Sequence, residues 1–408
     1  MSTRTTLFTV LAAVIIFLPW GRTADALPEV TGEAAVLMDS RNGQFIYEKN
    51  ASQRMYPAST TKILTAIIAL ESGKLNDMVT ISAGSCNVEG SAIGLQEGEK
   101  ISMVDLLYAM MLNSGNDAAM AIATHIAGSI EGFAELMNKK AAAIGAVNSH
   151  FNNPSGLPDP NHFTTAQDMA LIALYAMQNP EFRKIVATHT QTIKRADPLA
   201  QTYLENSNRL LWNYEGTIGV KTGYTNDAGQ CLVSAANRHG RELLAVVMKA
   251  EGNNIWSDSM ALLDYGFNGF INVCLTEAGK PAGEIEVYYG ESESVPVQTG
   301  CSLYYNFPKY QEVALRTEVQ QAAIIKAPVK EGAKLGELVY FSGDYELGRV
   351  DLLAQKQVER KFLTKIWPWV IVVLLLAVLV LLVRKHNMAR RRRWHKYRQR
   401  NRLPYENM

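Results

Sequence analysis

The segment Tyr56-Pro57-Ala58-Ser59-Thr60-Thr61-Lys62 leads directly into a largely apolar stretch, Ile63–Leu70. This pattern predicts a helix over 59–72, with Ser59 at its start and Lys62 one turn further along the same face. A serine hydroxyl is a weak nucleophile unless a base lies beside it. A lysine amine can be that base if burial or a second cation lowers its pKa from about 10.4. The spacing alone also fits a capped helix with a solvated lysine.

Outward from this segment, strand-like and helical patterns alternate up to about residue 270. Strands are expected at Ala35–Asp39, Gln44–Glu48, Thr217–Lys221, Cys231–Asn237 and Glu242–Lys249. Helices are expected, besides 59–72, at Met103–Leu112, Ala118–Ile126, Phe133–Ile144 and Ala166–Met177. The last helix opens with Thr165-x-x-Asp168, a capping-box pattern. This order predicts an α/β (α+β) domain whose helices pack on an antiparallel sheet.

Two further motifs could contribute to a site around Ser59. Ser114-Gly115-Asn116 falls between two predicted helices, where Asp117 could equally be a helix N-cap. Lys221-Thr222-Gly223 lies on a predicted strand that leads into Tyr224. A lysine and a threonine at a strand edge can hold a carboxylate, and the glycine lets a ligand approach the backbone. Each motif alone also fits ordinary loop or strand-end structure.

In this order the three motifs match the Ser-x-x-Lys, Ser-x-Asn and Lys-Thr-Gly set of the penicillin-interacting serine enzymes. The sequence resembles a serine-type D-alanyl-D-alanine carboxypeptidase of the low-molecular-mass penicillin-binding protein family, from Val30 to about Phe270. The resemblance also rests on the segments 113–118, Phe151–Leu157, His162–Ala170 and 219–225. It implies a penicillin-binding/β-lactamase-like fold for this region.

The resemblance implies a covalent mechanism. Ser59 would be acylated by a peptidoglycan stem peptide ending in D-Ala-D-Ala, releasing the last D-Ala, and Lys62 would be the base. Ser114 and Asn116 would relay a proton and hold the substrate amide. Water would then release the acyl group, and β-lactams would be covalent inhibitors. No metal or other cofactor is implied, and His162 and the other histidines show no metal-ligand spacing.

The resemblance also implies how the substrate is held. Lys221 and Thr222 would bind the terminal carboxylate, and Lys221 would be the second cation that lowers the pKa of the catalytic lysine. Gly223 and Tyr224 would complete the substrate-binding strand. The backbone N–H groups of Tyr224 and of the nucleophilic serine would form the oxyanion hole.

Two departures from the family pattern bear on function. Relatives often carry an arginine soon after the strand that follows Lys-Thr-Gly, but Lys249 is the only cation in 249–259. This stretch therefore supplies no arginine for carboxylate recognition, and Lys249 is the first residue to test for it. Many relatives also end in an amphipathic surface helix, whereas this chain ends in an apolar segment long enough to span a membrane.

That segment is Ile366–Val383, which carries no charged side chain. Trp367 and Trp369 lie at one end, as interface aromatics do. Residues 384–408 hold ten Lys or Arg and one acid, a local charge of +9, so the rest of the +1 chain carries about −8. We expect one transmembrane helix with a basic cytoplasmic tail and everything before it outside the cell. Anionic lipid explains the tail better than nucleic acid does.

The remaining boundaries complete the expected organisation. Residues 1–26 resemble a signal peptide cut after Ala26, although an uncleaved anchor at Leu7–Leu18 is the alternative. The catalytic domain is expected over 27–270 and a small all-β domain over 273–360, where the segments 327–332 and 335–336 resemble the family's carboxy-terminal domain. Its strands are expected at Glu284–Tyr289, Ser294–Gln298, Glu312–Leu315, Glu337–Phe341 and Leu347–Ala354. Export permits disulfides, but we expect free thiols at Cys86, Cys231, Cys274 and Cys301.

Other functions fit parts of the same pattern. A β-lactamase would use the same motifs, but the sequence lacks a Glu-x-x-Leu-Asn segment for class A deacylation. A D,D-endopeptidase would share the acyl-enzyme chemistry. A non-catalytic wall-binding scaffold would be favoured if a motif residue were missing, and none is.

Overall fold

The computed structural model describes residues 14–16, 27–321 and 323–400. They form two compact units that divide between residues 273 and 274, with 304–313 belonging to the first unit. The predicted signal peptide lies outside these residues, apart from the short strand β1 (Val14–Ile16).

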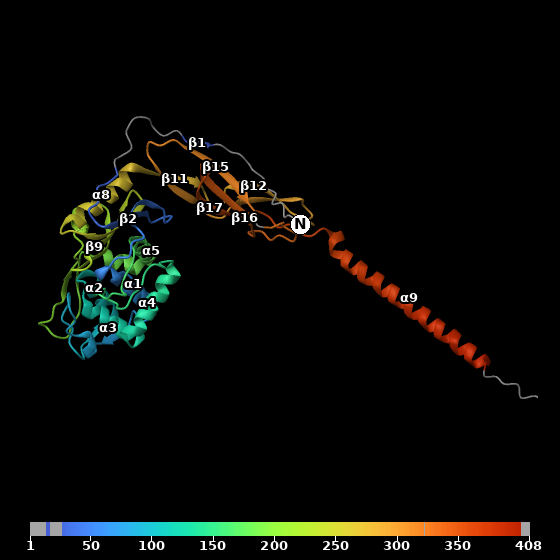
Figure 1. Cartoon of the computed structure of the whole chain (residues 1–408), viewed down its shortest axis with the longest axis horizontal. Coiled ribbons are helices and arrows are strands. Elements are labelled where there is room, and N and C mark those ends of the chain that lie inside the picture. Colours follow the sequence, from blue (N-terminus) through green and yellow to red (C-terminus); the bar gives the residue numbers. More distant parts are fainter. Residues whose placement is uncertain (1–13, 17–26, 322, 401–408) are drawn as a thin grey trace, which may run out of the picture. The chain divides into compact units, whose positions relative to one another are not determined.

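The first unit is built on a five-stranded antiparallel sheet in the order β3-β2-β10-β9-β8 (Figure 1). Its strands are β2 (Ala34–Asp39), β3 (Phe45–Lys49), β8 (Thr217–Thr225), β9 (Gly229–Arg238) and β10 (Arg241–Ala250). The central strand β10 pairs on both sides, so Val246 lies opposite Val36 on β2 and Val233 on β9. Because successive side chains of a strand point to opposite faces, β10 supplies apolar residues to two cores.

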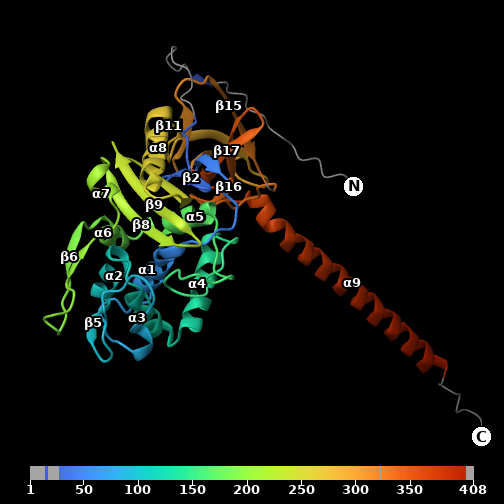
Figure 2. The same cartoon turned by 60° about the vertical axis from the view of Figure 1, so that its left-hand side comes forward.

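Helices cover both faces of this sheet (Figures 1 and 2). The larger core contains Val246 and the helices α1 (Lys62–Glu71), α2 (Met103–Leu112), α3 (Asn116–Ala127), α4 (Ile130–Ile144), α5 (Ala166–Met177) and α6 (Pro180–Ala187). The opposite core contains Val247 and the helices α7 (Leu210–Asn213) and α8 (Asn254–Gly269). This arrangement confirms the predicted fold class. The helices α6 and α8 were not predicted.

The second unit is mainly β-structure, as predicted. Its six-stranded sheet has the order β1-β15-β16-β17-β13-β12. The strands are β12 (Pro281–Glu286), β13 (Ser294–Thr299), β15 (Val313–Gln320), β16 (Lys334–Ser342) and β17 (Tyr345–Ala354). Buried residues such as Val295, Val297 and Leu352 form its own hydrophobic core. Two strands that the sequence did not predict, β11 (Phe270–Thr276) and β14 (Leu303–Pro308), pair with each other, and most of their residues belong to the first unit.

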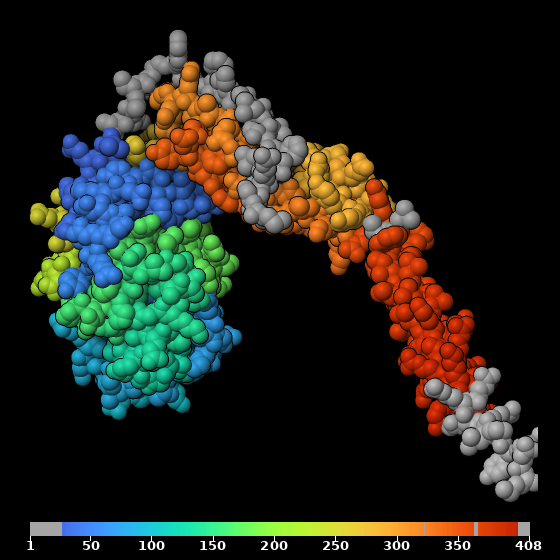
Figure 3. Space-filling view, turned by 45° about the vertical axis from the view of Figure 1, so that its right-hand side comes forward, coloured from blue at the N-terminus to red at the C-terminus, as the bar shows by residue number. Residues whose placement is uncertain are grey.

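The chain continues from this unit into one long helix, α9 (Phe362–Arg400). Within it, Ile366–Arg398 is long and apolar enough to cross a membrane. From Trp367 to Val383 its large apolar side chains are exposed, and on the face that Figure 3 shows no other part of the chain covers the helix. A soluble helix would bury such a surface against a core, so membrane anchoring accounts for it.

Candidate active site

The predicted nucleophile lies in a tight turn and not inside α1. Residues Ala58–Thr61 form the 3-10 turn η1, and α1 begins at Lys62. The Thr60 hydroxyl donates to the Pro57 carbonyl at 2.6 Å, which closes the turn. Ser59 is therefore half-exposed at the turn, while Lys62 points into the interior at the start of the helix.

The amine of Lys62 is fully buried among three oxygen atoms. Its Nζ lies 2.9 Å from Ser59 Oγ, 2.7 Å from Asn116 Oδ1 and 2.6 Å from the Ser155 carbonyl oxygen. A neutral amine has two N–H donors and one lone pair. The amide and carbonyl oxygens can only accept, so they take the two N–H groups. The lone pair is then left for the Ser59 hydroxyl, which is the arrangement a general base requires.

The surroundings of Lys62 favour this neutral form. Burial lowers its pKa well below the ordinary lysine value, and the nearby ammonium of Lys221 lowers it further. Asp117 acts in the opposite direction but contributes less. Lys221 is itself buried, which lowers its pKa to about 7, and its Nζ donates to the Thr222 carbonyl oxygen at 3.0 Å. The structure thus brings the two motif lysines together as predicted.

A loop that the sequence did not mark as catalytic supplies the second acceptor for the Lys62 N–H groups, the Ser155 carbonyl oxygen. The Asn153 Oδ1 accepts from the backbone N–H groups of Ser155, Gly156 and Leu157 and from the Ser155 hydroxyl, which fixes the loop. Gly156 has a φ of +86°, and a Cβ there would lie 1.8 Å from the Ala58 carbonyl oxygen. The loop therefore packs directly on η1, and this close approach aims the Ser155 carbonyl at Lys62.

The second motif occupies the junction between α2 and α3. Ser114 has a φ of +60° and faces the cavity, and Asn116 begins α3. The Asn116 amide is held from behind, because its Nδ2 donates to the Glu89 carbonyl at 2.6 Å. Asp117 is not the N-cap, which is Gly115. Its carboxylate accepts from the backbone N–H groups of 93 and 95 and so ties the 89–95 loop to α3.

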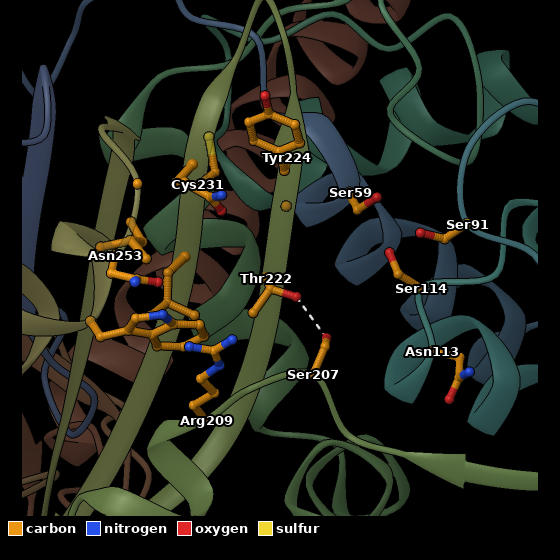
Figure 4. A pocket seen from close by; sticks show the side chains of 16 residues that line it. Ser59, Ser91, Asn113, Ser114, Ser207, Arg209, Thr222, Tyr224, Cys231 and Asn253 are labelled. Atoms are coloured by element: carbon orange, nitrogen blue, oxygen red, sulfur yellow. Dashed lines mark hydrogen bonds between the residues drawn. The ribbon is translucent and has the colours of Figure 1, made fainter.

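The third motif forms the opposite wall. Strand β8 passes so close to η1 that a Cβ on Gly223 would lie 2.9 Å from the Ser59 backbone nitrogen. The Thr222 hydroxyl is hydrogen-bonded to that of Ser207 at 2.8 Å, and both face a cavity of about 360 Å³ that also contains Ser59 and Ser114 (Figure 4). Tyr224 lies over the same cavity with an exposed ring. The buried ammonium of Lys221 does not line it.

Lys249, the first cation to test for carboxylate recognition, lies outside this cavity. It pairs with Glu33 at 2.6 Å and lines a different pocket. The charged group that does line the cavity is Arg209, whose guanidinium stacks 5.8 Å from the ring centre of Trp256 (Figure 4). Sequence reasoning missed Arg209 because it lies before the third motif and not after it.

Other candidate groups have structural roles. His162 is buried between Thr61 and the backbone N–H of Asn152, and burial lowers its pKa to about 4. The four cysteines are free thiols. Within the described residues, no group of three His, Cys, Asp or Glu side chains is placed to hold a metal ion.

Comparison with known proteins agrees with this geometry. Residues 22–252 match the family model of D-alanyl-D-alanine carboxypeptidases, and residues 270–360 match that of the penicillin-binding protein 5 C-terminal domain. The D-alanyl-D-alanine carboxypeptidase DacA of Haemophilus influenzae is 34% identical over 360 residues, covering 84% of this chain and 90% of that protein. DacF of Bacillus subtilis is 32% identical over 314 residues, covering 75% and 80%.

A solved structure extends the similarity to three dimensions. Penicillin-binding protein 5 from Haemophilus influenzae has a TM-score of 0.73 and 32% identity, covering 82% of this chain and 99% of that one.

Replacing Gly223 by alanine should push β8 away from η1. We expect acylation of Ser59 by a penicillin to slow on the order of 100-fold, because a displacement of about 1 Å at a reacting centre can cost that much. Stopped-flow or quenched mass spectrometry would measure the rate. Gly84→Ala is the matched control, since no atom lies within 4 Å of a Cβ there. An unchanged rate in Gly223→Ala would show that the close contact does not matter.

The acylation rate should rise with pH as Lys62 loses its proton. Lys221→Gln removes a positive charge that lowers the pKa of Lys62, so the midpoint of this rise should move to higher pH. Penicillin acylation rates across a pH series would show the shift independently of any loss in absolute rate. Lys249→Gln, which removes a cation outside the cavity, should leave the midpoint in place. A midpoint that stays fixed in Lys221→Gln would contradict the coupling.

Proposed function

The chain belongs to the serine D-alanyl-D-alanine carboxypeptidase family of penicillin-binding protein 5, and on that premise we propose that Ser59 is the nucleophile and Lys62 its base. The enzyme is a D-Ala-D-Ala carboxypeptidase that acts on peptidoglycan. The observation that carries the assignment is the buried Lys62 amine, with two acceptors for its N–H groups and Ser59 Oγ at 2.9 Å.

Acylation begins when Lys62 takes the proton of the Ser59 hydroxyl. The oxygen attacks the carbonyl carbon of the penultimate D-Ala, and the developing oxyanion is held by the backbone N–H groups of Ser59 and Tyr224. The intermediate collapses by breaking the peptide bond. The amine of the terminal D-Ala leaves after it receives the proton, which Ser114 relays from Lys62. An ester between Ser59 and the shortened stem peptide remains.

Deacylation uses the same groups in reverse. The leaving D-Ala vacates the space between Ser114 and Ser59, where a water molecule can enter. Lys62, again neutral, removes a proton from this water, directly or through Ser114, and the hydroxide equivalent attacks the ester. The proton then returns to Ser59 Oγ. Asn116 holds the amide of the acyl chain and keeps Lys62 in place through its Oδ1.

The terminal carboxylate is the group that distinguishes a carboxypeptidase substrate. We assign its recognition to Thr222, supported by Ser207 and by the positive charge of Arg209, which lines the same cavity. Lys221 contributes only through its positive charge, because its side chain is buried and does not line the cavity. β-Lactams carry a carboxylate in the corresponding position and acylate the same serine, so they are covalent inhibitors in this proposal.

The proposed location follows from α9. We infer a single membrane span by Ile366–Val383, with the two folded units on the extracytoplasmic side, where peptidoglycan lies. The tail 384–408, with its local charge of +9, would remain in the cytoplasm. Its charge suits anionic lipid, and no nucleic-acid partner is proposed.

Ser59→Ala should lose both reactions. We expect no mass increase with a labelled penicillin and no D-Ala release from a D-Ala-D-Ala peptide, whereas the wild type should show both. Intact-mass spectrometry and a D-Ala assay on the same samples measure this. Ser91→Ala is the matched control, because Ser91 also lines the cavity but its side chain has no role in the proposal. A penicillin adduct on Ser59→Ala would rule out Ser59 as the nucleophile.

Arg209→Gln should weaken turnover of peptides that end in a free carboxylate. A lost interaction with a charged group is worth about 1.5–3 kcal/mol, or about one to two decades in kcat/KM. A peptide amidated at its carboxy terminus should already be a poor substrate and should lose little more. Lys249→Gln should affect neither peptide. Equal losses on both peptides would show that Arg209 supports the fold and does not recognise the carboxylate.

A further inference from the structure

Three chain segments meet at the end of the β-rich unit from which α9 starts. The Tyr288 N–H donates to the Ile325 carbonyl at 2.9 Å. The Lys361 N–H donates to the Tyr289 carbonyl, also at 2.9 Å. Loop 288–291 is therefore joined by backbone hydrogen bonds both to the 324–327 segment and to the residue directly before α9.

These segments expose an unusual number of apolar side chains. Tyr288 is 49% exposed, Tyr289 55%, Ile324 65% and Phe362 72%; we call these four residues the tip cluster. In the described residues of the β-rich unit before α9, one other large hydrophobic side chain is comparably exposed, Tyr345 at 81%. Exposed apolar groups that gather at one end of a domain indicate a surface that is covered in use.

The position of Tyr345 shows that the cluster is confined to one end. Tyr345 begins β17, which runs to Ala354, a length of about 30 Å at 3.3 Å per residue. Val358, just beyond the end of β17, pairs with Val329 close to the tip cluster. Tyr345 therefore lies at the end of the sheet away from α9.

The short length of chain between the tip cluster and the apolar span indicates that the membrane surface covers the cluster. Phe362 begins α9 and lies four residues before Ile366, which is about 6 Å along a helix. The polar layer on each side of a bilayer is about 5–8 Å thick. Phe362 is therefore at headgroup depth when Ile366 enters the hydrocarbon. Tyr289 is held at the same level by its bond to Lys361.

The chemistry of the cluster fits this depth. Tyrosine and tryptophan favour the membrane interface, because the ring is apolar and its polar atom can stay hydrated. Trp367 and Trp369 continue the aromatic series into the helix. Both basic residues (Lys326, Arg360) and acidic ones (Glu291, Glu293) flank the cluster, so its charge does not select anionic lipid.

We propose that the tip cluster inserts into the headgroup layer of the membrane that α9 crosses. The β-rich unit then contacts the bilayer directly, in addition to being tethered to it, and its orientation relative to the membrane is restricted. This proposal rests on the membrane anchoring by α9 proposed above.

The test uses the full chain in vesicles of phosphatidylethanolamine and phosphatidylglycerol. An environment-sensitive fluorophore is attached to Tyr288→Cys, with Tyr345→Cys as the matched control and Leu376→Cys as the reporter of the span. The accessible native thiols are first replaced by serine at Cys86, Cys274 and Cys301. Quenching is measured with lipids that carry a nitroxide either at the headgroup or deep in the acyl chain.

We expect the headgroup nitroxide to quench the label at 288 and leave the label at 345 bright, while the deep nitroxide quenches the label at 376. Phe362→Cys is a second reporter of the cluster and should behave like 288. If 288 and 362 stay as bright as 345 while 376 is quenched, the anchor stands and the tip cluster does not enter the membrane. If 376 is not quenched either, the anchoring itself is wrong and this inference falls with it.

Discussion

The structure depends on one buried amine. Burying an ammonium at the position of Lys62 costs hydration free energy, which a charged partner would have to offset. The neighbours of Lys62 are instead uncharged: an amide oxygen, a carbonyl and a hydroxyl. Burial and the second lysine both favour the neutral form. Burial therefore has two linked effects: it makes the charged form of Lys62 unfavourable, and it leaves the amine neutral at neutral pH, so that it can act as a base.

Much of the surrounding fold holds that amine in place. The η1 turn presents Ser59, the 153–157 loop brings a carbonyl, and the α2–α3 junction brings Asn116. Strand β8 closes the site so tightly that only glycine fits at 223. These elements come from four distant parts of the chain, and the hydrophobic core that they share with α1 to α6 holds them in position. The active site is thus a property of the whole first unit.

The sequence predicted the elements whose signal is local. The Thr165 cap of α5 is present as expected, with its hydroxyl accepting from the Asp168 N–H, and all three motifs line or support one site. Helix α8 contains Gly266, and a glycine inside a helix weakens the helical signal of the sequence. A glycine is needed at this position because a Cβ would lie 2.5 Å from the Leu243 side chain. The Ser155 acceptor could not be predicted, since a backbone carbonyl has no side-chain signature. Arg209 reaches the site from a segment that no motif marks.

The central claim concerns the protonation state of Lys62, and an NMR titration of its side chain measures this directly. With lysine labelled at ¹³Cε, the Lys62 resonance can be assigned by its absence in Lys62→Arg. The account predicts that this resonance titrates well below the value of about 10.4 that is usual for exposed lysines. A Lys62 resonance that titrates together with the exposed lysines would show a permanent ammonium at neutral pH and would contradict its role as the base.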